Sequence, residues 1–377
     1  MRLAEMLSYA DIDQLHQLAS TYSCDCNINS KNELIQSLLT SIKRNAIIKE
    51  QIEMLSQAEF HFLMHLVFDG RKSFTLEDLR AKAKFSYLEE LDRDTYRKLV
   101  SIALKRGWIF RGMSRHSSSS FEIPEDMRKL WATAILQKEV GEQSVYEEPS
   151  FYRDEGLAII QDTHTFLRYV LNHEPTLTAD GVIYRRNQQQ ILELLSVREE
   201  LVEKGGWRFG YGRHFREYPD RFSLLYDFCF YRGYIREEAG ARLYLTPEAE
   251  EANQLPAELL AMEMYKFWLR LYKRPVIGLP MLARVIGLAA ERWISQEVLV
   301  QLLCRRLRSF YYDQPENIAQ NRILKMMVHI GLLRQGLVEE DRWVYQTTKF
   351  GHTMLESIEG SAMKDIILDK KKESEQN

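Results

Sequence analysis

Apolar and polar positions recur in one order at three places along the chain. In each place, a stretch with helical spacing ends at a glycine, apolar residues and an arginine follow, and a short polar turn leads into a second extended segment. The three stretches are YRKLVSIALKRGWIFRG with SRHSSSSFEIPED, then FSLLYDFCFYRGYIREEAGARLYLTPEAEE, and then NRILKMMVHIGLLRQGLVEEDRWVYQTTKFG. The pattern predicts a helix followed by two short strands that pair with each other.

The glycines of this pattern, Gly107, Gly233 and Gly331, stand where each helix is expected to end. A residue at this position often takes a left-handed backbone, which glycine adopts without a Cβ clash. The returning strands are predicted at 121–123, 242–245 and 343–346. Helix, strand, turn and strand in this order form the C-terminal half of a winged helix.

The segments before the first pattern supply the remaining helices of such a unit. Residues 56–69 begin with Ser56 and carry Glu59 three positions later, which predicts a capping box. Residues 74–85 begin with Thr75 as the expected cap. Three helices and a wing therefore make one complete unit at about 55–124.

The segments before the second and third patterns are less regular. Residues 176–195 read as a short strand or turn followed by a helix. The third pattern is preceded by predicted amphipathic helices at 262–272, 281–290 and 295–312.

The predicted fold class is mainly α with small β wings, arranged as tandem winged-helix-like units. Residues 141–150 read as an acidic connector, and HSSSS reads as a flexible wing tip. The predicted domains are a helical lead at 1–54, winged-helix-like units at 55–140 and 151–255, a helical plus winged-helix-like unit at 256–360, and a disordered tail at 361–377.

Composition limits the class of protein. The formal net charge is −3, so bulk charge does not predict a nucleic-acid partner and any basic surface must be local. The cysteines Cys24, Cys26, Cys229 and Cys304 are too few and too scattered for a disulfide framework. Residues 1–20 show no apolar signal-peptide core, and no apolar run is long enough to span a membrane. We therefore expect a cytoplasmic protein with no membrane contact.

Known catalytic and cofactor motifs are absent from the sequence. It contains no phosphate-binding loop, nucleophile elbow, paired-histidine zinc motif or dinucleotide fingerprint. Cys24 and Cys26 lie near His16 but lack further zinc ligands at a defined spacing, so ordinary thiols are the favoured interpretation. We expect no enzyme activity, cofactor, metal or small-molecule substrate.

The segment 205–222 interleaves aromatic residues with arginines. Its candidate nucleic-acid contacts are Arg208, Arg213 and Arg216, since arginines pair with phosphates and aromatic rings stack on bases. The alternative, slightly favoured, is a loop whose rings plug into the core while the arginines cover its outside.

The third helix and wing of the first unit carry a second group of candidates. In winged helices the third helix enters the major groove, and basic residues there contact phosphates. The candidates are Arg93, Arg97, Lys98, Lys105, Arg111 and Arg115. An exposed helix with solvated charges carries equal weight, because acidic residues directly precede this helix.

The most basic region is 265–334, which holds twelve Lys and Arg residues and four Asp and Glu residues. Arg305, Arg306 and Arg308 are followed there by Phe310, Tyr311 and Tyr312. This local charge is the best sequence support for nucleic-acid contact, although an acidic protein would fit the same surface.

A series of short motifs runs through about residues 30–252. They read ELIQSLL, IEMLSQAEFHFLMHLVFDG, DLRAKAKF, YRKLVSIALKRGWIF, FEIPEDM, LTADGVIYRR and GYIREEAGARLYLTPEAEE. Their order resembles the N-terminal, helicase-associated region of bacterial XPB-type helicases and related stand-alone proteins. The ATPase motor of those helicases is missing, because neither Walker motif is present. The resemblance therefore implies a DNA-related accessory module and carries over no catalytic residue.

Three hypotheses follow. The first is a non-enzymatic nucleic-acid-binding or helicase-accessory protein of a bacterial cytoplasm, with DNA as its partner. The second is a protein–protein adaptor, with a partner from DNA-processing or transcription machinery, whose third helices pack against that partner. The third, and weakest, is an enzyme with a site assembled from scattered residues such as His61, His65, His164 and His173.

Overall fold

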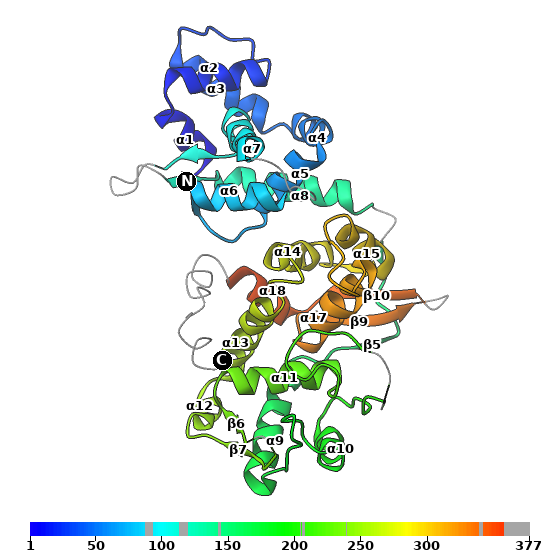
Figure 1. The fold of residues 1–377 in the computed structure, drawn as a ribbon. Coiled ribbons are helices and arrows are strands. Elements are labelled where there is room, and N and C mark those ends of the chain that lie inside the picture. Colours follow the sequence, from blue (N-terminus) through cyan, green and yellow to red (C-terminus); the bar gives the residue numbers. More distant parts are fainter. Residues whose placement is uncertain are drawn as a thin grey trace. The chain divides into compact units, whose positions relative to one another are not determined.

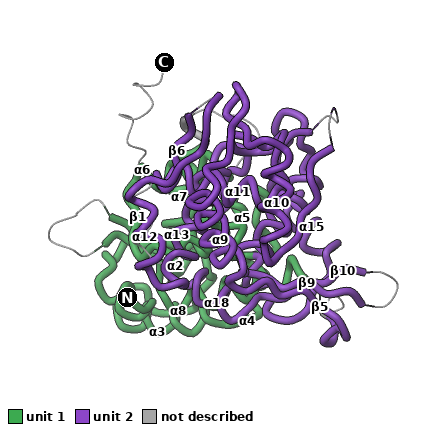
Figure 2. The backbone as a smooth tube through the Cα atoms, turned by 90° about the horizontal axis from the view of Figure 1, so that it is seen from below, with its two compact units in different colours: residues 1–144, 280–285, 358–377 green, residues 145–279, 286–357 purple. Residues whose placement is uncertain are grey.

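The computed structural model describes residues 1–86, 93–112, 120–141, 145–203, 205, 208–238, 240–338 and 342–357. These residues form two compact units (Figure 2). Unit 1 holds residues 1–144 with 280–285, and unit 2 holds residues 145–279 with 286–357. Both are mainly helical with small antiparallel sheets, which confirms the predicted fold class at that level. The predicted tail and most of the HSSSS wing tip lie outside the described residues.

Unit 1 begins with a helical lead, as predicted. Its helices are α1 (Leu3–Tyr9), α2 (Ile12–Thr21), α3 (Lys31–Ile42) and α4 (Asn45–Glu53). Copy 1, residues 57–139, then runs helix, strand, helix, helix, strand, strand, helix (Figure 1). Its elements are α5 (Gln57–Val67), β1 (Ser73–Thr75), α6 (Leu76–Phe85), α7 (Arg93–Lys105), β2 (Phe110–Arg111), β3 (Ser120–Glu122) and α8 (Glu125–Glu139). The returning strand β3 lies between β1 and β2 and is antiparallel to both.

Local capping fixes where the first two helices of copy 1 begin. The Ser56 hydroxyl accepts the amide of Glu59 at 3.3 Å, and the Glu59 carboxylate accepts the amide of Ser56 at 2.8 Å. This confirms the predicted capping box. Thr75 caps α6 in the same way, with Asp78 as its partner.

Unit 2 repeats this order in copy 2, residues 158–254. The elements are α9 (Ala158–His173), α10 (Arg185–Leu194), α11 (Asp220–Tyr231), β6 (Ile235–Glu237), β7 (Leu243–Leu245) and α12 (Ala249–Gln254). Between α9 and α10, Thr176 forms an antiparallel bridge to Arg242 beside β7. The chain at Thr176 therefore occupies the place that β1 has in copy 1.

Copy 3, residues 279–357, follows the linking helix α13 (Ala257–Leu271) and has the same order. Its elements are α14 (Leu279–Ala289), β8 (Trp293–Ser295), α15 (Gln296–Cys304), the composite helix α16 (Pro315–Asn317), η2 (Ile318–Leu324) and α17 (Lys325–His329), then β9 (Leu333–Val338), β10 (Arg342–Thr347) and α18 (Lys349–Ser357). The middle stretch η2 has π-helical hydrogen bonding. As in copy 1, the returning strand β10 lies between the other two, β8 and β9.

The predicted helix at 295–312 is too long. Helix α15 ends at Cys304, and the chain then makes a tight turn in which Phe310 and Asp313 exchange backbone hydrogen bonds at 2.9 and 3.0 Å. These bonds replace the helical ones that the apolar spacing had suggested.

The predicted connector at 141–150 is also partly wrong, because it contributes to a sheet. Strands β4 (Val145–Tyr146) and β5 (Phe151–Arg153) add to opposite edges of the sheet of copy 3, which has the order β4-β8-β10-β9-β5. Between them, Pro149 lies over Gly336, where an added Cβ would be 2.4 Å from the Pro149 ring. The segment therefore straps the sheet and pairs edges that would otherwise be open.

The three pattern glycines have left-handed backbones, as predicted, with φ values of 66°, 74° and 84° at Gly107, Gly233 and Gly331. Their surroundings differ. A Cβ on Gly331 would lie 2.0 Å from the Gly156 carbonyl oxygen, whereas a Cβ on Gly233 would meet nothing within 4 Å. The backbone of copy 3 is therefore packed directly against the turn at Gly156, just before copy 2.

This difference predicts unequal effects of the same substitution. Gly233→Ala should lower the free energy of unfolding by about 1 kcal/mol, the cost of a left-handed alanine. Gly331→Ala adds a backbone clash and should cost at least about 2 kcal/mol more. Urea unfolding followed by circular dichroism measures both, and equal losses in the two variants would contradict the close packing at Gly331.

Candidate nucleic-acid interface

The third helices of the three copies differ in how much surface they expose. In α11, every residue from 221 to 229 is buried. In the composite helix of copy 3, residues 322–324 and 326–330 are buried. Neither helix therefore has a broad face that could lie in a DNA groove. Helix α7 buries Leu99 and Ala103 but exposes a polar face.

The exposed face of α7 is basic. Arg97, Ser101 and Lys105 recur every four residues, and Lys98 lies beside Arg97; all four are exposed. This spacing places them along one side of the helix. Residues 96–105 contain no acidic side chain, so the acidic stretch before the helix does not extend onto this face.

The other candidates of copy 1 are placed only in part. Arg93 begins α7, but its side chain lies outside the described part of the chain, as does Arg115 entirely. Arg111 is exposed on β2, the strand that precedes the predicted wing tip. The structure thus brings four of these six candidates into view, three on α7 and one on β2.

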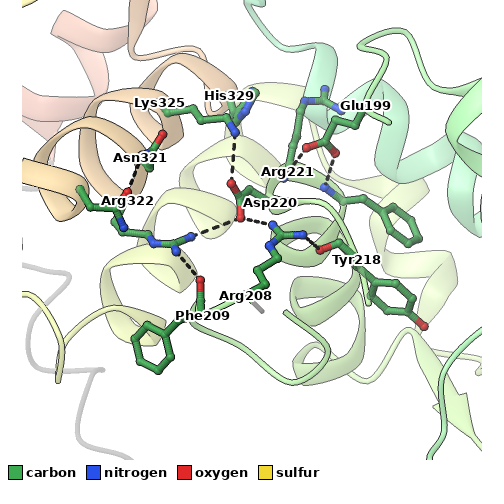
Figure 3. Close-up of polar contacts among 12 residues, drawn as sticks. Glu199, Arg208, Phe209, Tyr218, Asp220, Arg221, Asn321, Arg322, Lys325 and His329 are labelled. Atoms are coloured by element: carbon green, nitrogen blue, oxygen red, sulfur yellow. Dashed lines mark hydrogen bonds and ion pairs between the residues drawn. The ribbon is translucent and has the colours of Figure 1, made fainter. Parts of the chain in front are cut away.

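A cluster of ionised side chains holds the buried third helices of unit 2 together (Figure 3). Asp220, at the first turn of α11, accepts hydrogen bonds from Arg208, from Arg322 Nη1 at 3.2 Å and from Lys325 Nζ at 3.1 Å. Burial alone would raise the pKa of Asp220, but the charges of Lys325, Arg208 and Arg322 outweigh it and lower the pKa below its usual range. Asp220 is therefore a carboxylate shared by three cations.

Arg322 joins three separate parts of unit 2. Besides Asp220, its guanidinium donates to the buried Asp313 carboxylate at 3.0 Å and to the Phe209 carbonyl oxygen. Its side chain is only 8% exposed. Arg322 lies in the π-helical stretch η2, a kind of irregularity that is frequent at functional sites. The same side chain thus connects the loop before α11, the turn before α16 and the first turn of α11.

A second buried cluster lies behind the first. The fully buried Arg221 donates to Glu155 at 3.1 Å and lies 2.6 Å from the Asp162 carboxylate. His329 lies 3.0 Å from Glu155. Burial opposes ionisation of Glu155, but the hydrogen bond and charge of His329 and the charge of Arg221 lower its pKa to about 2. Glu199 accepts the backbone amides of Arg221 and of the next residue, so a carboxylate also caps α11.

The arginines of the 205–222 segment are largely engaged within the protein. Arg208 is half-buried and donates to Asp220 and to the Tyr218 carbonyl oxygen. Arg213 pairs with Glu237 at 2.6 Å and lies over the Phe230 ring. Arg216 is exposed, with its guanidinium 5.7 Å from the Phe215 ring. Arg213 and Arg216 are both exposed residues, but the Arg213 guanidinium is held by Glu237.

The aromatic rings of this segment meet the turn before α16. The Phe209 ring lies 6.4, 6.1 and 5.7 Å from the rings of Phe310, Tyr311 and Tyr312. It also lies 5.8 Å from the Phe215 ring. Tyr311 and Tyr312 nevertheless remain 78% and 68% exposed. We call these five residues the aromatic cluster.

Three arginines that follow α15 directly precede the turn of the aromatic cluster in the sequence. Arg305 and Arg308 are exposed, and Arg306 is half-buried and donates to the Leu302 carbonyl oxygen. Other cations of the 265–334 region serve the interior instead. Arg322 and Lys325 bind Asp220, and Arg334 lies over the rings of Tyr152 and Trp293. The surface of this region is therefore less basic than its composition suggests.

No group of three or more His, Cys, Asp or Glu side chains within the described ranges is arranged to hold a metal ion. The His16 ring instead contacts the Ile28 carbonyl oxygen at 2.7 Å. Within the same ranges, no helix has the length and apolar character needed to cross a membrane.

Comparisons with known proteins found no relative. No family model matches the sequence, and neither a curated protein nor a solved structure matches the chain. Geometry and chemistry therefore carry the functional argument.

Sequence reasoning found the basic and aromatic residues but missed the contacts that organise them. Asp220 and Arg322 lie 102 residues apart. No local pattern predicts such a pair. In the sequence, an aspartate and an arginine so far apart cannot be told from charged residues that lie in solvent. The sequence signal closest to this contact was Asp220 itself, because an acidic residue at the expected start of a helix indicates a carboxylate with a structural role.

Asp220→Asn removes one of the two carboxylates that neutralise the buried Arg322. We expect it to lower the free energy of unfolding by about 3 kcal/mol at pH 7. The unfolded carboxyl has a pKa of about 3.9. Because folding lowers that pKa, the stabilisation is present above about pH 4 and is lost as the pH falls through the folded value. The wild type and the variant should therefore converge in acid.

Thermal and urea unfolding between pH 3 and pH 7 test this expectation. Asp180→Asn is the matched control, because Asp180 is an exposed aspartate of the same unit. A difference between wild type and Asp220→Asn that stays constant across this range would contradict the ionised cluster.

Proposed function

We propose that the chain is a non-enzymatic nucleic-acid-binding protein built from winged-helix-like units, in which α7 of copy 1 contacts duplex DNA. The observation that carries the proposal is the exposed basic face of α7, formed by Arg97, Lys98 and Lys105 on the third helix of its copy. In helix-turn-helix proteins this helix lies in the major groove.

The surroundings of α7 agree with that use. The helix is followed by β2 and β3, which are paired as the two strands of a wing are. Arg111 is exposed at the start of this wing. A helix and a wing that both carry exposed arginines can bind phosphates on either side of a groove. The resemblance to helicase-associated regions points the same way, and we extend the proposal to an accessory role beside DNA-processing proteins of a bacterial cytoplasm.

The adaptor hypothesis rests here on an apolar surface and no longer on third helices that pack against a partner. Third helices that are buried in their own unit, as α11 is, offer no face to a partner. An apolar row does remain: Phe151, Leu337 and Trp343 lie opposite one another on β5, β9 and β10 and are 84%, 39% and 44% exposed. Exposed apolar groups of this kind favour protein contacts. A pull-down partner lost in Trp343→Ser would support an adaptor.

Duplex binding is tested by fluorescence anisotropy with a labelled 20-base-pair DNA at 50 and 200 mM salt. Phosphate contacts predict stronger binding at the lower salt concentration. The double variant Lys98→Ala/Lys105→Ala should weaken binding about tenfold and lower the slope of log K against log salt by about 2, one unit for each lost contact.

The control is the double variant Lys49→Ala/Lys129→Ala, which removes two exposed lysines from other helices of unit 1. It should bind as the wild type does. Absence of duplex binding at 50 mM salt, or an equal loss in both double variants, would refute α7 as the contact.

A further inference from the structure

The turn before α16 displays two tyrosines at its tip. Phe310 and Asp313 close the turn with a pair of backbone hydrogen bonds, so that Tyr311 and Tyr312 are the two residues between them. Both rings are more than two-thirds exposed. Large aromatic side chains are usually buried where they can be, so two adjacent exposed rings call for an explanation.

The backbone of this turn makes the tyrosines still more unusual. Tyr311 has a φ of 51°, in the left-handed region that glycine and asparagine favour. A bulky residue adopts it at a cost in stability, and such strain concentrates at functional sites. Glycine at position 311 would suit the fold better. The tyrosine ring at position 311 is therefore present despite its cost to the stability of the turn.

The turn is anchored to the interior of unit 2 through Asp313. The Asp313 carboxylate is buried and accepts hydrogen bonds from Arg322 at 3.0 Å and from Asn317 at 2.5 Å. Arg322 also holds the Phe209 carbonyl, and the Phe209 ring contacts both tyrosine rings. Anchored rings lose little conformational entropy when a ligand stacks on them.

Exposed arginines lie in the same two segments. Arg305 and Arg308 precede the turn, and Arg216 follows Phe215 in the loop that supplies Phe209. Rings for stacking and cations for phosphates are the combination that binds unpaired nucleic-acid strands. In a duplex the faces of the bases are already covered by neighbouring bases. Exposed tyrosines therefore favour an unpaired strand, whose bases can stack on them.

We propose that Tyr311 and Tyr312 form a stacking platform for unpaired bases, with Arg216, Arg305 and Arg308 near the phosphates, and that the ligand of unit 2 is single-stranded nucleic acid. This site shares no residue with the duplex contact proposed on α7. Either one can fail without the other.

The test uses the full chain and two labelled 20-nucleotide strands at 50 mM salt, one of thymidine and one abasic. Both carry the same phosphates, so only stacking distinguishes them. The wild type should bind the thymidine strand about tenfold more tightly than the abasic strand. Tyr311→Gly should weaken binding of the thymidine strand about tenfold and leave the unfolding temperature unchanged or higher, because it relieves the strained backbone.

Two further variants keep the test decisive. Tyr312→Ala should also weaken binding of the thymidine strand, whereas Tyr9→Ala, which removes a 62% exposed tyrosine from unit 1, should not. Lys98→Ala/Lys105→Ala should still bind this strand. Equal binding of thymidine and abasic strands, or thymidine binding that survives both Tyr311→Gly and Tyr312→Ala, would overturn the platform. It would leave the duplex contact on α7 to be judged by its own experiment.

Discussion

The guanidinium of Arg322 is the contact on which the architecture of unit 2 depends. It joins the first turn of α11, through Asp220, to the turn before α16, through Asp313, and to the loop at Phe209. A buried arginine is tolerable because its charge is met by two carboxylates and a carbonyl. The same contacts link the third helices of copies 2 and 3 and tie the Phe209 backbone to the residue that holds the turn at 310–313.

The three copies share one order of helices and strands, but they expose different surfaces. Copy 1 leaves its third helix with an exposed basic face, whereas copies 2 and 3 use theirs as core. The segment 145–153 adds a further difference between the copies, because its strands β4 and β5 pair with both edges of the sheet of copy 3. A repeated fold does not imply a repeated function. In our proposal the duplex contact belongs to unit 1 and the unpaired strand to unit 2.

Local signals in the sequence predicted local structure well. The Ser56–Glu59 capping box and the left-handed glycines at 107, 233 and 331 follow from hydrogen-bonding rules that involve a few neighbouring residues. The predictions at 295–312 and 141–150 were wrong where distant parts of the chain decided the outcome. Apolar spacing alone continued α15 into the turn. Acidic composition hid two strands whose partners lie far along the chain, Ile294 for Val145 and Leu337 for Phe151. Counting charges over 265–334 likewise overstated the basic surface, because Arg322, Lys325 and Arg334 serve interior contacts. The candidate site could be listed from the sequence but not assembled from it.

Photo-crosslinking tests the central claim most directly, because it reports which residues touch a bound strand. A single strand containing 5-iodouracil would be irradiated with the full chain, and the attached peptides identified by mass spectrometry. We expect attachment at Tyr311 or Tyr312, with Phe209 or Phe215 as secondary positions. Attachment confined to unit 1, or to parts of unit 2 away from 208–216 and 305–313, would contradict it.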